Sequence, residues 1–511
     1  MNSLILHGHF YQPPRENPWT GEVEAEPSAA PFHDWNDRIT AECYAANAAA
    51  GVGNGVVNNY AKISFNFGPT LLSWMEDHHP EIYELILEAD RLSVRNRSGH
   101  GNAIAQAYGH AILPLCNPRD RLTQVRWGIA DFRYRFKREP ESLWLPETAC
   151  NDETLSLLIE EQLRYVILAP GQAERYRRLN TDKWSSAAEN VVDVSKPYRY
   201  FHRDGSGRSI TIFFYDGPLA RAIAFEKALV SSTLLVQMFK QAAHDAGRDG
   251  GLLNIAIDGE TFGHHFKFGD LCLAHTLEVE APQAGFELTN YGQHLDRFPA
   301  EFEVEINHGP LGEGSSWSCV HGVSRWNCDC GCHTGGGPGW NQEWRGPLRD
   351  ALNFLRDENA REFERAGSDI FDDVWEARNA YIHLILDQGR SREVFFQQYA
   401  KTALSPALER RALTLLEVQR AALLMFTSCG WFFSDIAGLE PLQILKYACR
   451  AIDLMDDLGM PSPRRRFLEI LSEAKSNRPQ LGNGADVYRK LVEPTKPSLR
   501  SEAEEMAGEL S

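Results

Sequence analysis

The chain has 511 residues, 43% hydrophobic and 24% charged, which is the composition of a globular protein long enough for one large domain and a smaller one. Its formal net charge of −18 disfavours nucleic acid and anionic membrane surfaces as partners, because an acidic surface repels phosphate groups. No apolar run reaches the length of a membrane span or a signal-peptide core, and ten cysteines are too few for a disulfide scaffold, so we expect a cytoplasmic protein.

Six short apolar runs within the first 300 residues predict β-strands. Gly, Pro or Asn bound them and segments of helical length separate them, which is typical of parallel βα units. The predicted strands span 3–7, 62–67, 142–146, 165–169, 209–215 and 252–257. Helices are predicted between them at 37–50, 69–89, 119–137 and 152–163.

Polar side chains follow five of the predicted strands at the point where each strand ends. In chain order they are His7, His9 and Gln12, then Asn66, Glu147, Asp216, Asp258 and Glu260. Any one of them could be an ordinary turn residue. Because the carboxyl ends of parallel strands meet at one face of an α/β barrel, their repetition predicts a barrel over residues 1–300 with a shared site.

The chain changes character after the predicted barrel. Residues 301–346 crowd Gly, Trp and Cys together without a helical or strand period, which predicts a long, functional loop. Residues 347–475 predict a helical bundle, because apolar side chains recur every three to four positions behind caps such as Ser405-Pro406. Residues 476–511 are polar and predict a partly flexible tail.

The loop also holds a cluster of possible metal ligands. Four thiols and two imidazoles lie within 15 residues, at Cys319, His321, Cys328, Cys330, Cys332 and His333. Soft ligands at that density suit zinc or an iron–sulfur centre, but their spacing matches no standard zinc pattern. We therefore expect no metal and no other cofactor, and keep Cys319, Cys328, Cys330 and Cys332 as the candidate ligands if a metal binds.

Two of the strand-end carboxylates suit the cleavage of a glycosidic bond. Glu147 and Asp258 would end different strands and face each other across a pocket, one as nucleophile and the other as general acid and base. The plainer alternative is that each is a turn residue paired with one of the 52 basic side chains.

Four segments, in order along the chain, carry a family resemblance. His7-Gly-His9-Phe-Tyr-Gln12 is similar to the opening His-x-His-Gln-Pro motif of glycoside hydrolase family fifty-seven, with two residues inserted before the glutamine. The other three segments resemble the family's second, third and fourth motifs: Gly101-Asn102 with His110-Ala-Ile-Leu-Pro-Leu, Trp144-Leu-Pro-Glu147, and Asp258-Gly-Glu260-Thr-Phe-Gly-His264. SSWSCVHGVSRW, DCGC and LLMFTSCGWFFSDIAGLE further along look like a mostly uncharacterised subgroup of that family.

The resemblance implies a (β/α)7 barrel followed by a C-terminal helical bundle, retaining chemistry and α-glucan substrates. It gives Glu147 the place of the nucleophile and Asp258 that of the acid/base. Such a pair works at a separation of about 5–5.5 Å, where like charges push the two pKa values apart. Glu260 is expected to support Asp258 or to accept a sugar hydroxyl, or alternatively to cap the next helix.

Further substrate-binding candidates lie in these motifs and in the later segments. They are His7, His9, Gln12, His110, Trp144, Asp216, Glu260, His264, Trp317, Trp326, Trp431 and Asp435. The histidines are expected to hydrogen-bond sugar hydroxyls, and Trp317 and Trp326 to stack on sugar faces, because a Gly-rich loop offers them little core. The segment from Cys429 to Asp435 interrupts the helical pattern and could close a sugar subsite, although helix packing would explain its aromatic residues equally well.

Two other classes of function stay open. A metal-dependent sugar hydrolase, of the zinc α-mannosidase or polysaccharide-deacetylase type, would draw its ligands from His7, His9, Asp258, His264 and His265. A non-catalytic glucan-binding protein would keep the fold without turnover, although both carboxylates are present. Among enzymes, the sequence does not separate hydrolysis, glucan transfer, branching and α-galactoside cleavage. The expected partner in each case is an oligosaccharide or polysaccharide.

Overall fold

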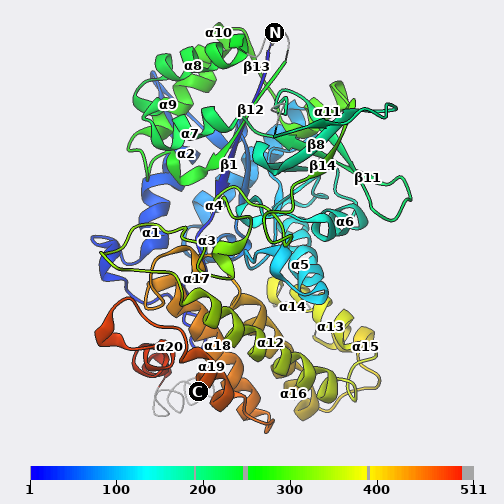
Figure 1. The fold of residues 1–511 in the computed structure, drawn as a ribbon, viewed down its shortest axis with the longest axis vertical. Coiled ribbons are helices and arrows are strands. Elements are labelled where there is room, and N and C mark those ends of the chain that lie inside the picture. The colour runs from blue at the N-terminus through cyan, green and yellow to red at the C-terminus, as the bar shows by residue number, and fades with distance from the viewer. Residues whose placement is uncertain (1, 189–191, 246–250, 388–391, 498–511) are drawn as a thin grey trace. The chain divides into compact units, whose positions relative to one another are not determined.

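The computed structural model describes residues 2–188, 192–245, 251–387 and 392–497 (Figure 1). The chain forms two compact units, which are taken one at a time below. The first unit comprises Met1–Gln12, Glu26–Tyr108 and Leu113–Gly322, and the second comprises Pro13–Ala25, Gly109–Ile112 and Val323–Ser511. The first unit thus runs past residue 300, where the sequence predicts the barrel to end, and includes part of the predicted loop.

Parallel strands form the centre of the first unit. β1 (Asn2–Phe10) pairs with β12 (Leu252–Asp258) along one edge. On its other edge, β1 pairs with β13 (Phe286–Leu288) at its beginning and with β4 (Ser64–Phe67) at its end. β1 and β12 are buried along almost their whole length, as expected for parallel strands with neighbours on each side.

The parallel pairing continues beyond β4 through short strands. An isolated parallel bridge leads from β4 towards β5 (Ala105–Gln106), which pairs with β6 (Leu143–Trp144). A second bridge leads from β6 to β7 (Tyr165–Leu168), which pairs with β11 (Ser209–Phe214). The Asp216 amide, just after β11, then donates to the Asn254 carbonyl of β12 at 2.7 Å. The strand path that leaves β1 through β4 thereby returns to β12.

The six predicted strands are confirmed as β1, β4, β6, β7, β11 and β12. Two further strands that pair in parallel with the predicted ones were not predicted: β5, which has two residues, and β13, which has three. A mixed sheet in the order β7–β11–β10–β14–β8–β9 was also not predicted. Its additional strands are β8 (Ala173–Arg178), β9 (Ser185–Ser186), β10 (Pro197–Phe201) and β14 (Phe302–Ile306), and a separate hairpin joins β2 (Ala50–Val52) to β3 (Gly55–Val57).

Helices cover the strands of the first unit (Figure 1). They are α1 (Trp35–Ile39), α2 (Ala45–Ala48), α3 (Pro69–His78), α4 (Pro80–Asn96), α5 (Pro118–Phe136), α6 (Asp152–Glu160), α7 (Gly217–Phe225), α8 (Ser232–Asp245), α9 (Gly269–His275), α10 (Ala281–Gln283) and α11 (Tyr291–Arg297). The prediction of a single helix at 69–89 is wrong: the helix is interrupted at His79, and a second helix, α4, starts at Pro80. Proline lacks the N–H of an interior helical residue but suits a first turn.

The second unit is a helical bundle, as predicted. Its helices are α12 (Arg345–Gly367), α13 (Val374–Ala380), α14 (Ile382–Leu386), α15 (Arg392–Tyr399), α16 (Pro406–Leu424), α17 (Cys429–Phe432), α18 (Leu439–Asp457), α19 (Arg464–Leu471) and α20 (Gly484–Val487). The predicted cap of α16 is present, since Ser405 Oγ accepts from the Leu408 amide at 3.3 Å. Of the predicted tail, residues 476–497 carry α20, and 498–511 lie outside the described residues. Within the described part of the chain, no helix has both the length and the hydrophobicity to cross a membrane.

One prediction concerns the packing of α5 on β5. A Cβ atom at Gly128 would lie 1.9 Å from the Gln106 carbonyl oxygen, so Gly128→Ala forces helix and strand apart. We expect the free energy of unfolding to fall by about 1–3 kcal/mol, the usual cost of overpacking. Urea unfolding measures this, with Gly171→Ala as control because nothing lies within 4 Å of a Cβ there. Equal midpoints for the two variants would contradict the contact.

Candidate active site

Asp258 is the last residue of β12 and lies in register with residues on two neighbouring strands. Its partner on β1 is His9, and the partner of His9 on β4 is Asn66. The three residues therefore form one row across adjacent parallel strands, near their carboxyl ends. β12 stops at Asp258, and Gly259–Thr261 forms a 3-10 turn, so Glu260 lies just beyond the end of the strand.

Glu147 lies in a single 3-10 turn, Pro146–Thr148, directly after β6. Its φ is +58° and that of Thr148 is +50°, so two consecutive non-glycine residues are left-handed. Each such residue costs about 1–3 kcal/mol and persists only where other contacts hold it. Two side chains of the predicted loop hold the carboxylate: Trp317 Nε1 donates to Glu147 Oε2 at 2.9 Å, and Ser318 Oγ donates to the same oxygen at 2.6 Å.

The carboxyl groups of Glu147 and Asp258 interact electrostatically, although they are 111 residues apart in the sequence. The pKa of Asp258 is raised well above its usual range, mainly because surrounding protein removes water from it, and further by the charges of Glu147 and Glu260. The side chain of Asp258 nevertheless keeps access to solvent. Asp258 is therefore a carboxyl that retains its proton to an unusually high pH while remaining reachable.

Glu260 is buried beside this pair with hydrogen-bond partners of its own. Its Oε1 accepts from the Tyr44 hydroxyl at 2.6 Å and from the Tyr11 amide at 2.9 Å. Burial raises the pKa of Glu260 to about 7, against the opposing effect of these hydrogen bonds. Because its charge also raises the pKa of Asp258, Glu260 fits the supporting role that the sequence offered as one alternative.

The two histidines of the first motif belong to a hydrogen-bonded chain. Asn66 Nδ2 donates to His9 Nδ1 at 2.9 Å and to Gln106 Oε1 at 2.7 Å, while Asn66 Oδ1 accepts from His7 Nε2 at 3.0 Å. Burial lowers the pKa of His7 and of His9 to about 3, and the charge of His7 adds to the effect on His9. Both rings are therefore neutral.

His7 and Trp144 are both buried in the first unit. His7 is fully buried, and both its ring nitrogens have protein partners, Ser64 Oγ at 3.0 Å and Asn66. Trp144 is 1% exposed and stacks on the imidazoles of His7 and His9, with ring centroids 4.8 and 4.9 Å apart. Contact of either side chain with a sugar stays a prediction.

Three other predicted residues of the first unit have local protein partners. Gln12 Nε2 donates to the Tyr11 carbonyl at 2.9 Å. Asp216 caps α7, accepting from the Leu219 amide at 3.1 Å, which is the ordinary turn role that the sequence left open. His264 pairs with the Glu42 carboxylate. A role in substrate binding stays a prediction for each of them.

The predicted site residues of the second unit are buried within it. Trp326 and Trp431 are fully buried and donate through their indole N–H groups to the carbonyls of Ser428 and Arg345, each at 3.2 Å. Asp435 is buried and accepts from the Asn477 amide at 2.6 Å. Packing and backbone hydrogen bonds account for the positions of these three side chains, and their contact with sugar stays a prediction. His110 is also buried, with Nδ1 2.7 Å from Ser428 Oγ, and its substrate role stays a prediction.

The cysteine candidates divide between the two units. Cys319 is buried in the first unit, and Cys328, Cys330 and Cys332 are half-buried in the second. Whether any of them binds a metal stays a prediction.

Sequence reasoning missed several residues that shape the site. They are Tyr44, Gln106, Tyr215 and Ser318, and Asn66 was noted only as a strand-end residue. Tyr215 contacts the Trp317 ring edge-on at 6.1 Å, and its pKa is raised by burial and by the charge of Asp258. Of these residues, only two have a position in the sequence that could have indicated a place in the site. Tyr215 ends a predicted strand, and Ser318 follows the candidate Trp317.

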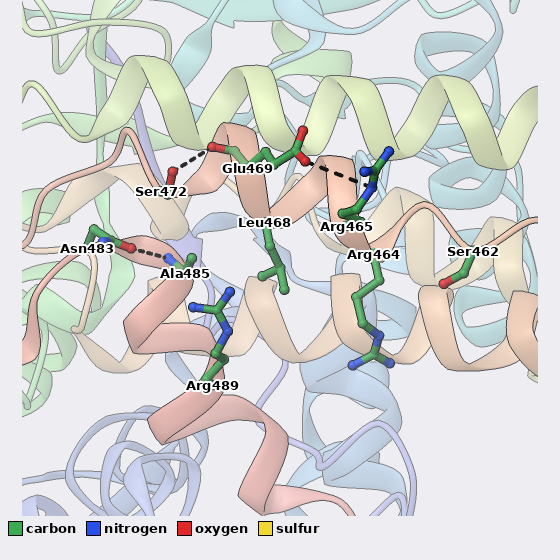
Figure 2. A pocket seen from close by; sticks show the side chains of 9 residues that line it. All are labelled: Ser462, Arg464, Arg465, Leu468, Glu469, Ser472, Asn483, Ala485 and Arg489. Atoms are coloured by element: carbon green, nitrogen blue, oxygen red, sulfur yellow. Dashed lines mark hydrogen bonds and ion pairs between the residues drawn. The ribbon is translucent and has the colours of Figure 1, made fainter.

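A separate cavity of about 550 Å³ lies in the second unit (Figure 2). It is lined by Ser462, Arg464, Arg465, Leu468, Glu469, Ser472, Asn483, Ala485 and Arg489. Arg464 pairs with Asp453 at 2.8 Å, and Arg465 lies 3.9 Å from Glu469, so carboxylates already balance these arginines. No candidate catalytic residue lines this cavity.

The raised pKa of Asp258 predicts a pH-dependent effect on stability. A carboxyl whose pKa is higher in the folded than in the unfolded chain weakens folding at every pH above its unfolded value of about 3.9. We therefore expect Asp258→Asn to raise the melting temperature near pH 8 and to change it little near about pH 3, where the carboxyl is mostly protonated in both states. Thermal unfolding at the two pH values measures this.

Asp296→Asn is the matched control for that experiment, because hydrogen bonding to Arg164 lowers the pKa of Asp296. A lowered pKa stabilises the fold above the unfolded pKa, so this variant should be less stable near neutral pH. A melting-temperature change in Asp258→Asn that is the same at both pH values would contradict the account.

Comparison with known proteins identifies the family of the chain. Residues 36–307, just over half of the chain, match the model of "Glycosyl hydrolase family 57", and residues 340–509 match a domain of unknown function, DUF3536. The 4-alpha-glucanotransferases of Thermococcus litoralis and Thermococcus kodakarensis are 20% and 23% identical, over 50% and 62% of this chain. The matches span only 36% and 42% of those two relatives.

Solved structures of similar fold cover nearly the whole chain. An exo-type maltose-forming amylase from Pyrococcus sp. ST04 has a TM-score of 0.66 at 15% identity, covering 99% of this chain and 94% of the amylase. A branching enzyme from Thermococcus kodakaraensis has a TM-score of 0.58 at 14% identity, covering 97% of each chain. At these identities the structures show likeness of fold alone. Taken with the family match, they show that this chain is a member of glycosyl hydrolase family 57.

Proposed function

We propose that this protein is a retaining glycoside hydrolase or transglycosylase that acts on α-1,4-linked glucans through a covalent glycosyl-enzyme intermediate. Glu147 is the nucleophile and Asp258 the acid/base. The observation that carries the proposal is the electrical coupling of two strand-end carboxyls in unequal surroundings. One is held by two hydrogen-bond donors, and the other has a raised pKa and access to solvent.

In the first step, Glu147 attacks the anomeric carbon while Asp258 gives its proton to the glycosidic oxygen. The bond between that carbon and oxygen breaks, the shortened glucan leaves with the proton, and the sugar is left as an ester of Glu147. The raised pKa of Asp258 suits this step, because the carboxyl must still carry its proton when the substrate binds.

In the second step, Asp258 is ionised and acts as a base. It takes a proton from water, or from the hydroxyl of an acceptor glucan, whose oxygen attacks the anomeric carbon and releases Glu147. Two inversions at that carbon give net retention. With Glu147 neutralised as the ester, the charge that raised the pKa of Asp258 is gone, so Asp258 is a stronger acid in the intermediate.

Several observations support the fold and substrate parts of the proposal. The parallel path β1–β4–β5–β6–β7–β11–β12 and its return hydrogen bond support an incomplete (β/α)7 barrel. The names of the similar proteins, two 4-alpha-glucanotransferases, a maltose-forming amylase and a branching enzyme, support an α-glucan oligosaccharide or polysaccharide as the substrate. The cysteine content, too sparse for a disulfide scaffold, supports the cytoplasm as its location.

The alternative of a metal-dependent sugar hydrolase draws little support from the first motif. Both ring nitrogens of His7 have protein partners, so His7 would have to give up Ser64 or Asn66 to bind a metal.

The catalytic assignment predicts the behaviour of two variants. Glu147→Gln has nearly the same shape but no nucleophilic charge, so we expect product formation from maltooligosaccharides, amylose and glycogen to fall at least about a thousandfold while glucan binding remains. Asp258→Asn should lose activity most on substrates with poor leaving groups, and should keep more of it on an activated aryl glucoside that leaves without a proton. Product chromatography and initial rates measure both effects.

Two outcomes would overturn the assignment. If the wild-type protein binds α-glucans but releases no product from any of them, the non-catalytic alternative stands. If activity is present but is lost on dialysis against a chelator and restored by zinc, the metal-dependent alternative stands.

A further inference from the structure

The loop segment from Ser315 to Ser318 contacts Glu147 through both side-chain and backbone hydrogen bonds. We propose that Trp317 and Ser318 are positioning residues of the reaction. They donate to one carboxylate oxygen of Glu147, favour the charged form of the group and fix its rotation. This inference rests on the proposed function and names residues within that site to which no role is assigned by the family motifs in the chain.

Two side-chain contacts define the arrangement. Both donors reach the same oxygen, Glu147 Oε2, from Trp317 Nε1 at 2.9 Å and from Ser318 Oγ at 2.6 Å. An indole N–H can only donate, so Glu147 Oε2 is the acceptor of the bond from Trp317. Hydrogen bonds to a carboxylate stabilise its charged form, the form that a nucleophile needs.

Backbone hydrogen bonds hold the same loop segment against the turn Pro146–Thr148, which carries Glu147 and is called the nucleophile turn below. The Trp317 amide donates to the Glu147 carbonyl at 3.0 Å, and Cys150 and Ser315 exchange a pair of bonds of 2.9 and 3.0 Å. Gln172 Nε2 donates to the Thr148 carbonyl at 2.8 Å and to the Ser315 carbonyl at 3.1 Å. These bonds provide the contacts that a left-handed Glu147 and Thr148 require.

Glycines allow the loop to approach this closely. Gly314 has a φ of +140°, and a Cβ there would lie 2.6 Å from the Cys150 carbonyl oxygen. Gly309 and Gly322, also with positive φ, would each place a Cβ 2.4 Å from the Gly314 carbonyl oxygen. The glycine content of this segment therefore serves a close backbone approach to the nucleophile turn.

The two carboxyl groups are therefore driven towards different protonation states. Trp317 and Ser318 favour the ionised form of Glu147, while desolvation and two nearby charges favour the protonated form of Asp258. The chain thus distinguishes the nucleophile from the acid by placing two hydrogen-bond donors on Glu147 and by desolvating Asp258. The competing role for Trp317, stacking on a sugar face, would act on substrate binding instead.

Three variants test the inference by steady-state kinetics. Ser318→Ala and Trp317→Phe each remove one donor, and phenylalanine keeps an aromatic ring. We expect each to lower kcat by roughly 10- to 100-fold, the effect of one charge-assisted hydrogen bond, with KM nearly unchanged. Ser316→Ala is the matched control, because Ser316 Oγ donates to the Gly322 carbonyl at 2.7 Å and does not contact Glu147. A Trp317→Phe protein with raised KM and unchanged kcat would instead show a stacking role and overturn the inference.

A second measurement does not depend on turnover. The indole N–H resonance of Trp317, assigned by its loss in Trp317→Phe, should shift as Glu147 is protonated at low pH. It should lose that titration in Glu147→Gln, and its midpoint should move to higher pH in Ser318→Ala but not in Ser316→Ala. A resonance insensitive to Glu147→Gln would overturn the inference. If this titration is seen in a protein that converts no α-glucan, the hydrogen-bonding arrangement stands and only the proposed reaction fails.

Discussion

Two carboxyl groups whose charges act on each other are the constraint from which the rest of the site follows. Ionising both Glu147 and Asp258 in partly dehydrated surroundings is unfavourable, so the protein must stabilise one charge and leave the other group protonated. Hydrogen-bond donors to Glu147 Oε2 and the desolvation of Asp258 achieve this division. A pair arranged in this way suits an acid and a nucleophile, and offers little to the stability of the fold.

The surroundings of the pair contribute neutral hydrogen-bonding groups instead of further charges. His7 and His9 are buried and uncharged, Asn66 hydrogen-bonds to both, and Trp144 stacks on both rings. A positively charged imidazole at His9, which pairs in register with Asp258, would favour ionisation of that carboxyl and work against the proposed role of Asp258 as an acid. The low pKa of His9 therefore agrees with the raised pKa of Asp258.

The sequence was most informative where function and strand geometry coincide. Six strands of the parallel arrangement were predictable from the apolar runs that contain them, and Glu147 and Asp258 were proposed from their places at strand ends within recognisable motifs. The two-residue β5 has no period to detect, and the break between α3 and α4 depends on a single proline.

Burial was the property that the sequence did not reveal. Trp326, Trp431 and Asp435 stand in two segments that interrupt regular patterns, as exposed functional residues often do, yet tertiary packing buries all three. His7 and Trp144 are buried as well, because motif position does not distinguish an exposed residue of a site from one behind it. Ser318 escaped notice because its relation to Glu147 exists only once residues 171 positions apart meet.

The most direct test of the account is chemical trapping of the glycosyl-enzyme intermediate. A fluorinated α-glucosyl fluoride forms the ester faster than the ester is hydrolysed, so the labelled enzyme accumulates. Proteolysis and mass spectrometry then identify the labelled residue. The account predicts one labelled peptide, with the sugar on Glu147, and release of the label when an acceptor glucan is added. A label on any other residue, or product of inverted anomeric configuration, would contradict it.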